Sequence, residues 1–111
     1  MHTISWDEFE KVETRVGTIT QVDDFPEARK PAYKLLIDLG EFGIKRSSAQ
    51  ITTLYTKEEL IGKQIVCVIN FPIKKIGAYE SEVLTCGFYR ENGDVVLVVP
   101  DKPVSNGLKL G

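Results

Sequence analysis

Residues 66–84, VCVINFPIKKIGAYESEVL, decide the fold that we expect for this chain. The stretch begins as an apolar run typical of a β-strand, breaks at Pro72, and re-enters a strand at Val83. Between the two strands lies a polar loop with two adjacent lysines, Lys74 and Lys75. A strand that ends in a long basic loop and then resumes is typical of a barrel that presents a binding loop. A solvated hairpin tip is the alternative.

The size and composition of the chain predict a single domain over residues 1–111. The chain is 42% hydrophobic and 27% charged, which is ordinary for a globular protein. A domain of this length buries about two thirds of its unfolded surface. No apolar run approaches the ~20 residues of a membrane span, and the acidic N-terminus is unlike a signal peptide. We therefore expect a cytoplasmic protein with no membrane insertion.

The reactive residue types indicate neither a metal site nor an enzyme. Cys67 and Cys86 lie in apolar runs, where cysteine behaves as a small buried hydrophobic residue. Two separated cysteines and one histidine make no recognisable zinc set. No glycine-rich phosphate loop or nucleophile elbow is present. We expect no metal, no cofactor and no catalytic residue.

The net charge of −2 hides an asymmetry along the chain. Residues 1–28 carry two basic and seven acidic side chains, and residues 29–75 carry nine basic and four acidic ones. Residues 76–111 carry three basic and five acidic side chains. The total charge argues against a general nucleic-acid binder, whereas the local excess of cations favours one anionic partner at one place.

A short N-terminal helix, three strands, a second helix and then two or more strands are expected in chain order. A strand over Val12–Asp23 changes phase around Gly17, which predicts a β-bulge there. A strand at Ala32–Leu39 has apolar side chains at alternate positions, and a strand at Ile44–Ser48 runs back in the opposite direction. A capping box at Thr56–Glu59 then predicts a helix before the C-terminal strands. This order is that of an all-β OB-fold, a five-stranded Greek-key barrel with short helices, an N-terminal helix and a C-terminal extension.

A homodimer would explain an excess of apolar surface. Ser5 and Glu8 form a capping box that opens a short helix, and the strands near the C-terminus are apolar on both faces. Burial of both strand faces requires a second cover, which is either a second subunit or the N-terminal helix. The residues expected at a dimer interface are Trp6, Phe9, Val83, Val96 and Val98.

The basic residues concentrate on one expected face. An OB-fold binds oligonucleotides on its second and third strands and with two neighbouring loops. Seven of the fourteen basic residues fall on these elements, namely Arg29, Lys30, Lys34, Lys45, Arg46, Lys74 and Lys75. Lysine contacts phosphate as a point charge, and aromatic rings stack on bases. The pattern predicts binding to structured RNA through this face.

Several blocks of sequence resemble a known family, the tRNA-binding domain found alone or appended to methionyl- and tyrosyl-tRNA synthetases. The blocks are EKVETRVGTI (10–19), KLLI (34–37), RSSAQI (46–51), ELIGK (59–63), and NFP (70–72) leading to SEVL (81–84). The closing PDKPVSNG (100–107) and the spacing of FPEAR and PAYKL resemble a stand-alone branch, the export-related chaperone CsaA. Ile73 and Leu84 depart from the family pattern, where a second proline and a methionine are usual.

This resemblance implies an OB-fold homodimer that binds tRNA by shape. It also implies, for the CsaA branch, binding to unfolded preproteins. The RNA-binding residues that it implies are Ser48, Gln50, Asn70, Lys74, Lys75 and Ser81.

A peptide-binding chaperone is the alternative function. It requires exposed apolar surface, which Phe71 and Tyr79 could supply. Salt distinguishes the two functions, because binding through phosphates weakens steeply with ionic strength and apolar peptide capture does not.

Overall fold

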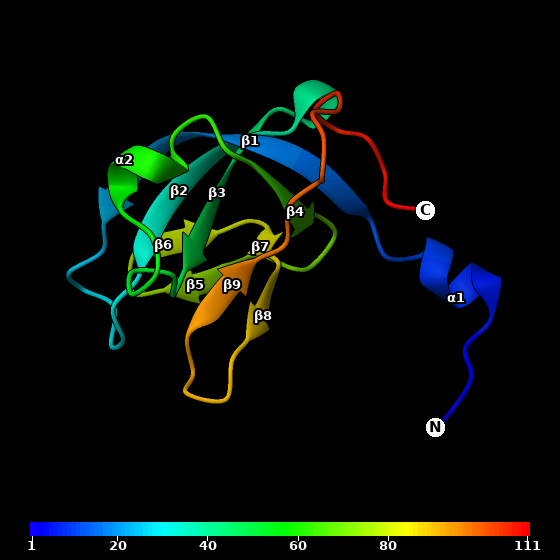
Figure 1. Ribbon diagram of the computed structural model, residues 1–111, viewed down its shortest axis with the longest axis horizontal. Coiled ribbons are helices and arrows are strands. Elements are labelled where there is room, and N and C mark those ends of the chain that lie inside the picture. Colours follow the sequence, from blue (N-terminus) through cyan, green and yellow to red (C-terminus); the bar gives the residue numbers. More distant parts are fainter.

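The computed structural model describes residues 1–111 and shows an antiparallel sheet that curls into a nearly closed barrel (Figure 1). The strand order is β3-β2-β1-β4-β7. These strands are β1 (Thr14–Asp24), β2 (Tyr33–Asp38), β3 (Ile44–Ala49), β4 (Gln64–Val68) and β7 (Leu84–Thr85). The predicted OB-fold is confirmed.

Short helices and two hairpins complete the molecule. The helices are α1 (Trp6–Glu10), the 3-10 turn η1 (Gly40–Phe42) and α2 (Lys57–Leu60). The hairpins pair β5 (Lys74–Ile76) with β6 (Tyr79–Ser81), and β8 (Gly87–Tyr89) with β9 (Val95–Leu97). Both predicted capping boxes are present, at Ser5 and at Thr56. No helix is long and apolar enough to cross a membrane.

The long strand β1 organises the barrel by pairing with a different neighbour in each half. Residues 14–18 pair with β4, and residues 18–24 pair with β2. The register shifts between Ile19 and Gln21, so the predicted bulge at Gly17 is wrong by three residues. Gly17 instead lies in regular pairing with Ile65.

Gly17 is required by close packing inside the barrel. A Cβ at this position would lie 2.5 Å from Cγ2 of Ile37 and 2.8 Å from Cδ2 of Leu39. Ile37 and Leu39 are both fully buried, so neither side chain has free space beside it. A glycine can therefore mark a tight contact between strands and not only a bulge.

The C-terminal extension covers the edge of β1 that β2 leaves open. Gly107 N–H donates to the Val16 carbonyl at 2.7 Å, and Leu110 N–H donates to the Thr14 carbonyl at 2.8 Å. An isolated antiparallel bridge joins Arg15 to Lys109. The first half of β1 consequently has backbone partners on both sides, which protects it from pairing with other chains.

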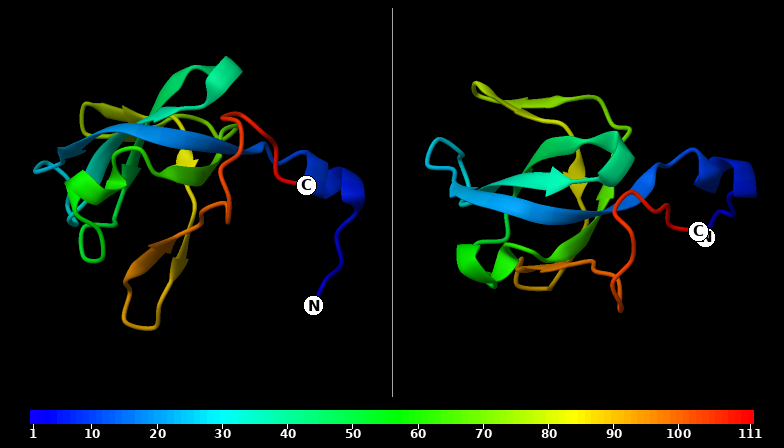
Figure 2. Two further views of the ribbon diagram at one scale, coloured as in Figure 1. Left: turned by 45° about the horizontal axis from the view of Figure 1, so that its top comes forward. Right: turned by 90° about the horizontal axis from the view of Figure 1, so that it is seen from above.

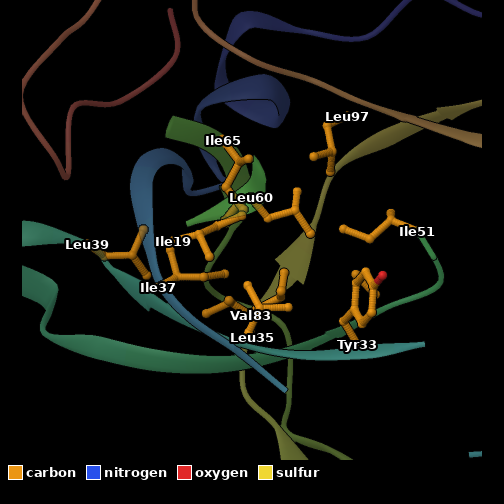
Figure 3. Packing of buried hydrophobic residues seen from close by; sticks show 13 residues of the cluster. Ile19, Tyr33, Leu35, Ile37, Leu39, Ile51, Leu60, Ile65, Val83 and Leu97 are labelled. Carbon is orange, nitrogen blue, oxygen red and sulfur yellow. The ribbon is translucent and has the colours of Figure 1, made fainter. Parts of the chain in front are cut away.

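The core lies inside the barrel and includes residues from every barrel strand except β7 (Figure 3). Ile19, Leu35, Ile37 and Ile65 have no more than 1% of their surface exposed. Val83 packs in the same cluster and is 6% exposed, so its side chain is not available to a second subunit. This burial argues against the expected place of Val83 at a dimer interface, which stays a prediction. Val96 and Val98, by contrast, are partly exposed.

Helix α1 stands away from the barrel at one end of the molecule (Figure 1). No α1 residue is buried, and Trp6 is 67% exposed. The rings of Trp6 and Phe9 lie 5.5 Å apart between centroids, so the two side chains share a face as predicted. The alternative in which the N-terminal helix covers the outer faces of the C-terminal strands is therefore excluded.

Candidate nucleic-acid interface

The hairpin β5–β6 carries the two lysines that the sequence placed in a loop. Lys74 and Lys75 lie on β5 and pair with Ser81 and Glu80 of β6, and Gly77 makes the turn with φ of 61°. Alternating strand residues point to opposite faces, so the two lysines project from opposite sides of β5. Both are exposed, and neither takes part in an ion pair.

Polar contacts fix this hairpin to β3. Ser48 N–H donates to Oγ of Ser81 at 3.1 Å, and Glu82 N–H donates to the Arg46 carbonyl at 2.8 Å. Arg46 Nε also donates to the Glu80 carbonyl at 3.1 Å. Ser81 is buried and holds the hairpin in place. The expected binding loop is therefore a positioned hairpin, which carries its lysines on regular backbone.

Three of the seven cations on the expected face have carboxylate partners. Lys34 lies 3.8 Å from Glu27, and Lys45 lies 3.8 Å from Glu82. Arg46 Nε lies 3.2 Å from Glu82 Oε1, and Arg46 Nη2 lies 3.6 Å from Glu80 Oε1. Glu80 and Glu82 thus reduce the positive charge along β3. The cations without ion pairs are Arg29 and Lys30 in the β1–β2 loop and Lys74 and Lys75 on β5.

Tyr79 belongs to an aromatic cluster beside β2. Its ring meets that of Phe25 edge-on at 5.2 Å, and the Lys34 ammonium lies 4.9 Å from the Phe25 centroid and 5.4 Å from that of Tyr79. Its hydroxyl donates to the Ser47 carbonyl at 3.3 Å, and burial raises the pKa of Tyr79. These contacts engage Tyr79 within the chain, so its expected role in holding a peptide is not supported by its position.

The Asn70 side chain hydrogen-bonds the N-terminal segment. Its Oδ1 accepts from Glu13 N–H at 3.0 Å, and its Nδ2 donates to the Lys11 carbonyl at 2.8 Å. Both ends of the amide are therefore engaged by backbone. The resemblance assigned Asn70 to the RNA face, whereas the structure gives it the task of tying the end of β4 to the segment that leads into β1.

A network of charged side chains joins the two ends of the chain at the same place. Lys109 Nζ lies 3.1 Å from Glu10 Oε2 and 3.2 Å from Glu13 Oε2, while Arg15 Nη2 lies 2.6 Å from Glu13 Oε1. The hydrogen bonds from Arg15 and then Lys109 lower the pKa of Glu13. We call Glu10, Glu13, Arg15 and Lys109 the terminal clasp. It fixes the base of α1 against the C-terminal extension.

A groove of about 610 Å³ collects several of the predicted residues. Ser48, Gln50, Phe71, Lys74 and Ser81 all line it, from the end of β3 and from the segment around β5 and β6. Residues of β8 and β9 also contribute, so both hairpins line the same groove, and Figure 2 shows the two hairpins extending from the barrel.

The groove residues that sequence reasoning missed include Tyr89 and Cys86. The pattern assigned both to a strand buried on two faces. The strand instead divides at Cys86, and Tyr89 is 75% exposed. Cys86 is partly exposed and Cys67 is buried, so the expectation of two buried thiols holds only for Cys67.

A small OB-type barrel with a basic hairpin and an adjoining groove defines a class of binding domain whose ligands lie on the barrel surface. Residues 14–109 match the model of the putative tRNA binding domain, and this chain belongs to that family.

The chain is similar to both synthetase-linked and stand-alone proteins. It is 34% identical over 111 residues to a methionine–tRNA ligase of Thermococcus kodakarensis, covering 99% of this chain but only 14% of the ligase. A crystal structure of chaperone CsaA from Bacillus anthracis matches with a TM-score of 0.94 and 47% identity, covering 99% of this chain and 100% of that one. The CsaA chaperone of Picrophilus torridus matches with a TM-score of 0.91 and 48% identity, covering 98% and 100%. The resemblance noted in the sequence is confirmed.

Proposed function

We propose that this chain binds tRNA or other structured RNA along the free edge of the β5–β6 hairpin. The observation that carries the proposal is the pair of exposed lysines, Lys74 and Lys75, on a hairpin fixed to the barrel. The family match supports RNA as the anionic partner. The family is not a catalytic one, and we propose no reaction.

The free edge explains how lysines on opposite sides of β5 can act together. The outer edge of β5 pairs with no other strand, so an RNA backbone that runs along this edge meets both ammonium groups. Arg29 and Lys30 add positive charge from the β1–β2 loop. Lysine reads no base edge in such a contact, so selectivity for sequence should be low.

The test is tRNA binding measured over a range of salt concentrations. Each phosphate contact contributes about 0.7–0.9 to the log–log slope, so Lys74→Ala and Lys75→Ala should each lower the slope by about that amount. The double variant should lower it by about 1.4–1.8. A matched control removes two exposed lysines elsewhere, Lys11→Ala with Lys102→Ala, and should leave the slope nearly unchanged. Equal slopes for wild type and the Lys74/Lys75 variant would refute this face.

Capture of unfolded polypeptide is a second candidate function. The groove beside β5 is lined by ten hydrophobic residues of eighteen, and Phe71 within it is 55% exposed. Two similar solved structures are described as CsaA chaperones, which favours the same activity here. Binding of an unfolded preprotein that changes little between low and high salt would support it.

A symmetric homodimer is proposed as the assembly in the cytoplasm, the location expected from the sequence. Ile4, Trp6, Leu108 and Leu110 are each more than half exposed at the end of the molecule that carries α1 and the C-terminus. Large apolar side chains gathered in one region typically mark an interface. Sedimentation at micromolar concentration should show a dimer, and Trp6→Ala should weaken it. A monomer under these conditions would refute the assembly.

A further inference from the structure

The groove beside β5 combines Lys74 of the proposed RNA-binding edge with aromatic and hydrogen-bonding groups that this edge does not use. Its volume of about 610 Å³ lies within the range of small-molecule pockets, about 300–1,000 Å³. The groove can hold a group larger than one amino-acid side chain, and Lys74 is one of the residues that line it. The lining side chains indicate which class of ligand it binds.

Two aromatic side chains in the groove have no aromatic partner. Phe71 is 55% exposed and Tyr89 is 75% exposed. The aromatic pairs of the chain join Trp6 to Phe9 and Phe25 to Tyr79, so the rings of Phe71 and Tyr89 are free to stack on a ligand. A base stacks on such a ring regardless of its identity, because every base has a π-face.

Three polar side chains in the groove are free to recognise a ligand. The Gln50 amide is exposed and can both donate and accept. The hydrogen bond from Ser48 to Ser81 uses the Ser48 backbone N–H, which leaves the Ser48 hydroxyl for a ligand. Lys74 supplies a cation without an ion-pair partner.

The carboxylate in the groove is already neutralised. Glu82 lines the groove, and its Oε1 lies 3.2 Å from Arg46 Nε and accepts from Arg46 N–H at the same distance. Its Oε2 lies 3.8 Å from Lys45 Nζ. Two cations therefore offset its repulsion of a phosphate, and the positive charge of Lys74 remains effective at the groove.

We propose that the groove holds one unpaired nucleotide of the bound RNA, with its base against Phe71 or Tyr89 and its phosphate at Lys74. Gln50 and Ser48 hydrogen-bond the base edge or the ribose. This inference rests on the proposed function and adds to it a preference for RNA with a single-stranded end or bulge. A nucleotide uses all three kinds of group, whereas an apolar peptide segment leaves the lysine and the amide without a role.

The experiment compares two RNAs at one salt concentration: a blunt-ended hairpin, and the same hairpin with a three-nucleotide overhang that contains 2-aminopurine. Wild type should bind the overhang RNA more tightly by roughly 5- to 150-fold, the range for stacking one base on an aromatic side chain. The 2-aminopurine fluorescence should fall on binding. Phe71→Ala or Tyr89→Ala should remove much of this preference and leave affinity for the blunt hairpin unchanged.

Phe88→Ala is the matched control. Phe88 is 67% exposed and adjacent to Tyr89 on β8, but it does not line the groove. This variant should keep the preference for the overhang. Phe71→Leu, which keeps the apolar bulk and removes the aromatic ring, covers the case in which Phe71→Ala fails to fold. The fall in 2-aminopurine fluorescence on binding should be absent in Phe71→Leu as well.

The possible results separate this inference from the function on which it rests. Equal binding of the two RNAs by wild type would overturn the nucleotide site and leave RNA binding along β5 intact. Failure to bind either RNA would refute the proposed function and this inference with it. An unfolded polypeptide that abolishes the overhang preference without displacing the blunt hairpin would show that the groove takes peptide, which also overturns the inference.

Discussion

Gly17→Ala tests whether close packing inside the barrel explains the glycine in β1. Alanine is the better strand residue by its backbone entropy, so without a clash the change would stabilise the protein by about 0.5–1 kcal/mol. The added Cβ, however, would lie 2.5 Å from Cγ2 of Ile37 and 3.0 Å from the Asp38 carbonyl oxygen. The sign of the change in stability therefore depends on whether these atoms can move.

The structure indicates that they cannot move freely. Cγ2 is attached directly to Cβ of a fully buried, β-branched residue, so it moves only with χ1 or with the backbone of β2. Overpacking of this kind costs about 1–3 kcal/mol. After the entropic gain is subtracted, Gly17→Ala should lower the free energy of unfolding by up to about 2.5 kcal/mol. The melting temperature should then fall by up to about 10 °C.

Urea unfolding of four proteins completes the test: wild type, Gly17→Ala, Ile37→Ala and the double variant. Ile37→Ala alone should cost about 2–5 kcal/mol because it leaves a cavity. The double variant should cost less than the sum of the two, by about 0.5–3 kcal/mol, because the new methyl group occupies part of that cavity. A stabilising Gly17→Ala, or strict additivity in the double variant, would refute the packing explanation.

Three further predictions follow from the thiols, the terminal clasp and Asn70. A thiol reagent near pH 8 should label Cys86 and spare Cys67 in the folded protein, because burial raises the pKa of Cys67 to about 12; equal labelling rates would contradict this. In the folded protein the pKa of Glu13 lies below its ordinary value of 4.5. The ionised carboxylate therefore stabilises the fold fully above pH 4.5, and this contribution is lost as the pH falls through the folded pKa. In urea unfolding at pH 3–7, Glu13→Gln should therefore be less stable than wild type near neutrality, and the difference should shrink in acid; a constant difference would exclude this role. Asn70→Ala should speed hydrogen exchange of the Glu13 amide, and Asn70→Asp, which keeps the Oδ1 acceptor, should speed it less; unchanged exchange in Asn70→Ala would show that this contact is weak.

The candidate site was only partly predictable from sequence. Lys74 and Lys75 were identified because adjacent cations between two apolar strands mark an exposed segment. Their place on a fixed hairpin depends on contacts such as the hydrogen bond from Ser48 to Ser81, which joins residues 33 positions apart. Tyr89 was missed because a run of apolar residues does not reveal where a strand divides and turns one of its faces outward.

Local sequence patterns determined strands β1 to β4, helices α1 and α2, and the order of these elements. The alternation in Tyr33–Asp38 set a strand with one buried face, and Ser5 and Thr56 set the starts of both helices, because these signals act over a few neighbouring residues. Only the tertiary structure decided which apolar and charged side chains were available to contact a ligand or a second subunit. Val83 packs in the core, and Glu82 forms ion pairs with Arg46 and Lys45. The Asn70 side-chain amide hydrogen-bonds the backbone of Lys11 and Glu13. Each of these outcomes depends on a partner distant in sequence, which only closure of the barrel brings into contact.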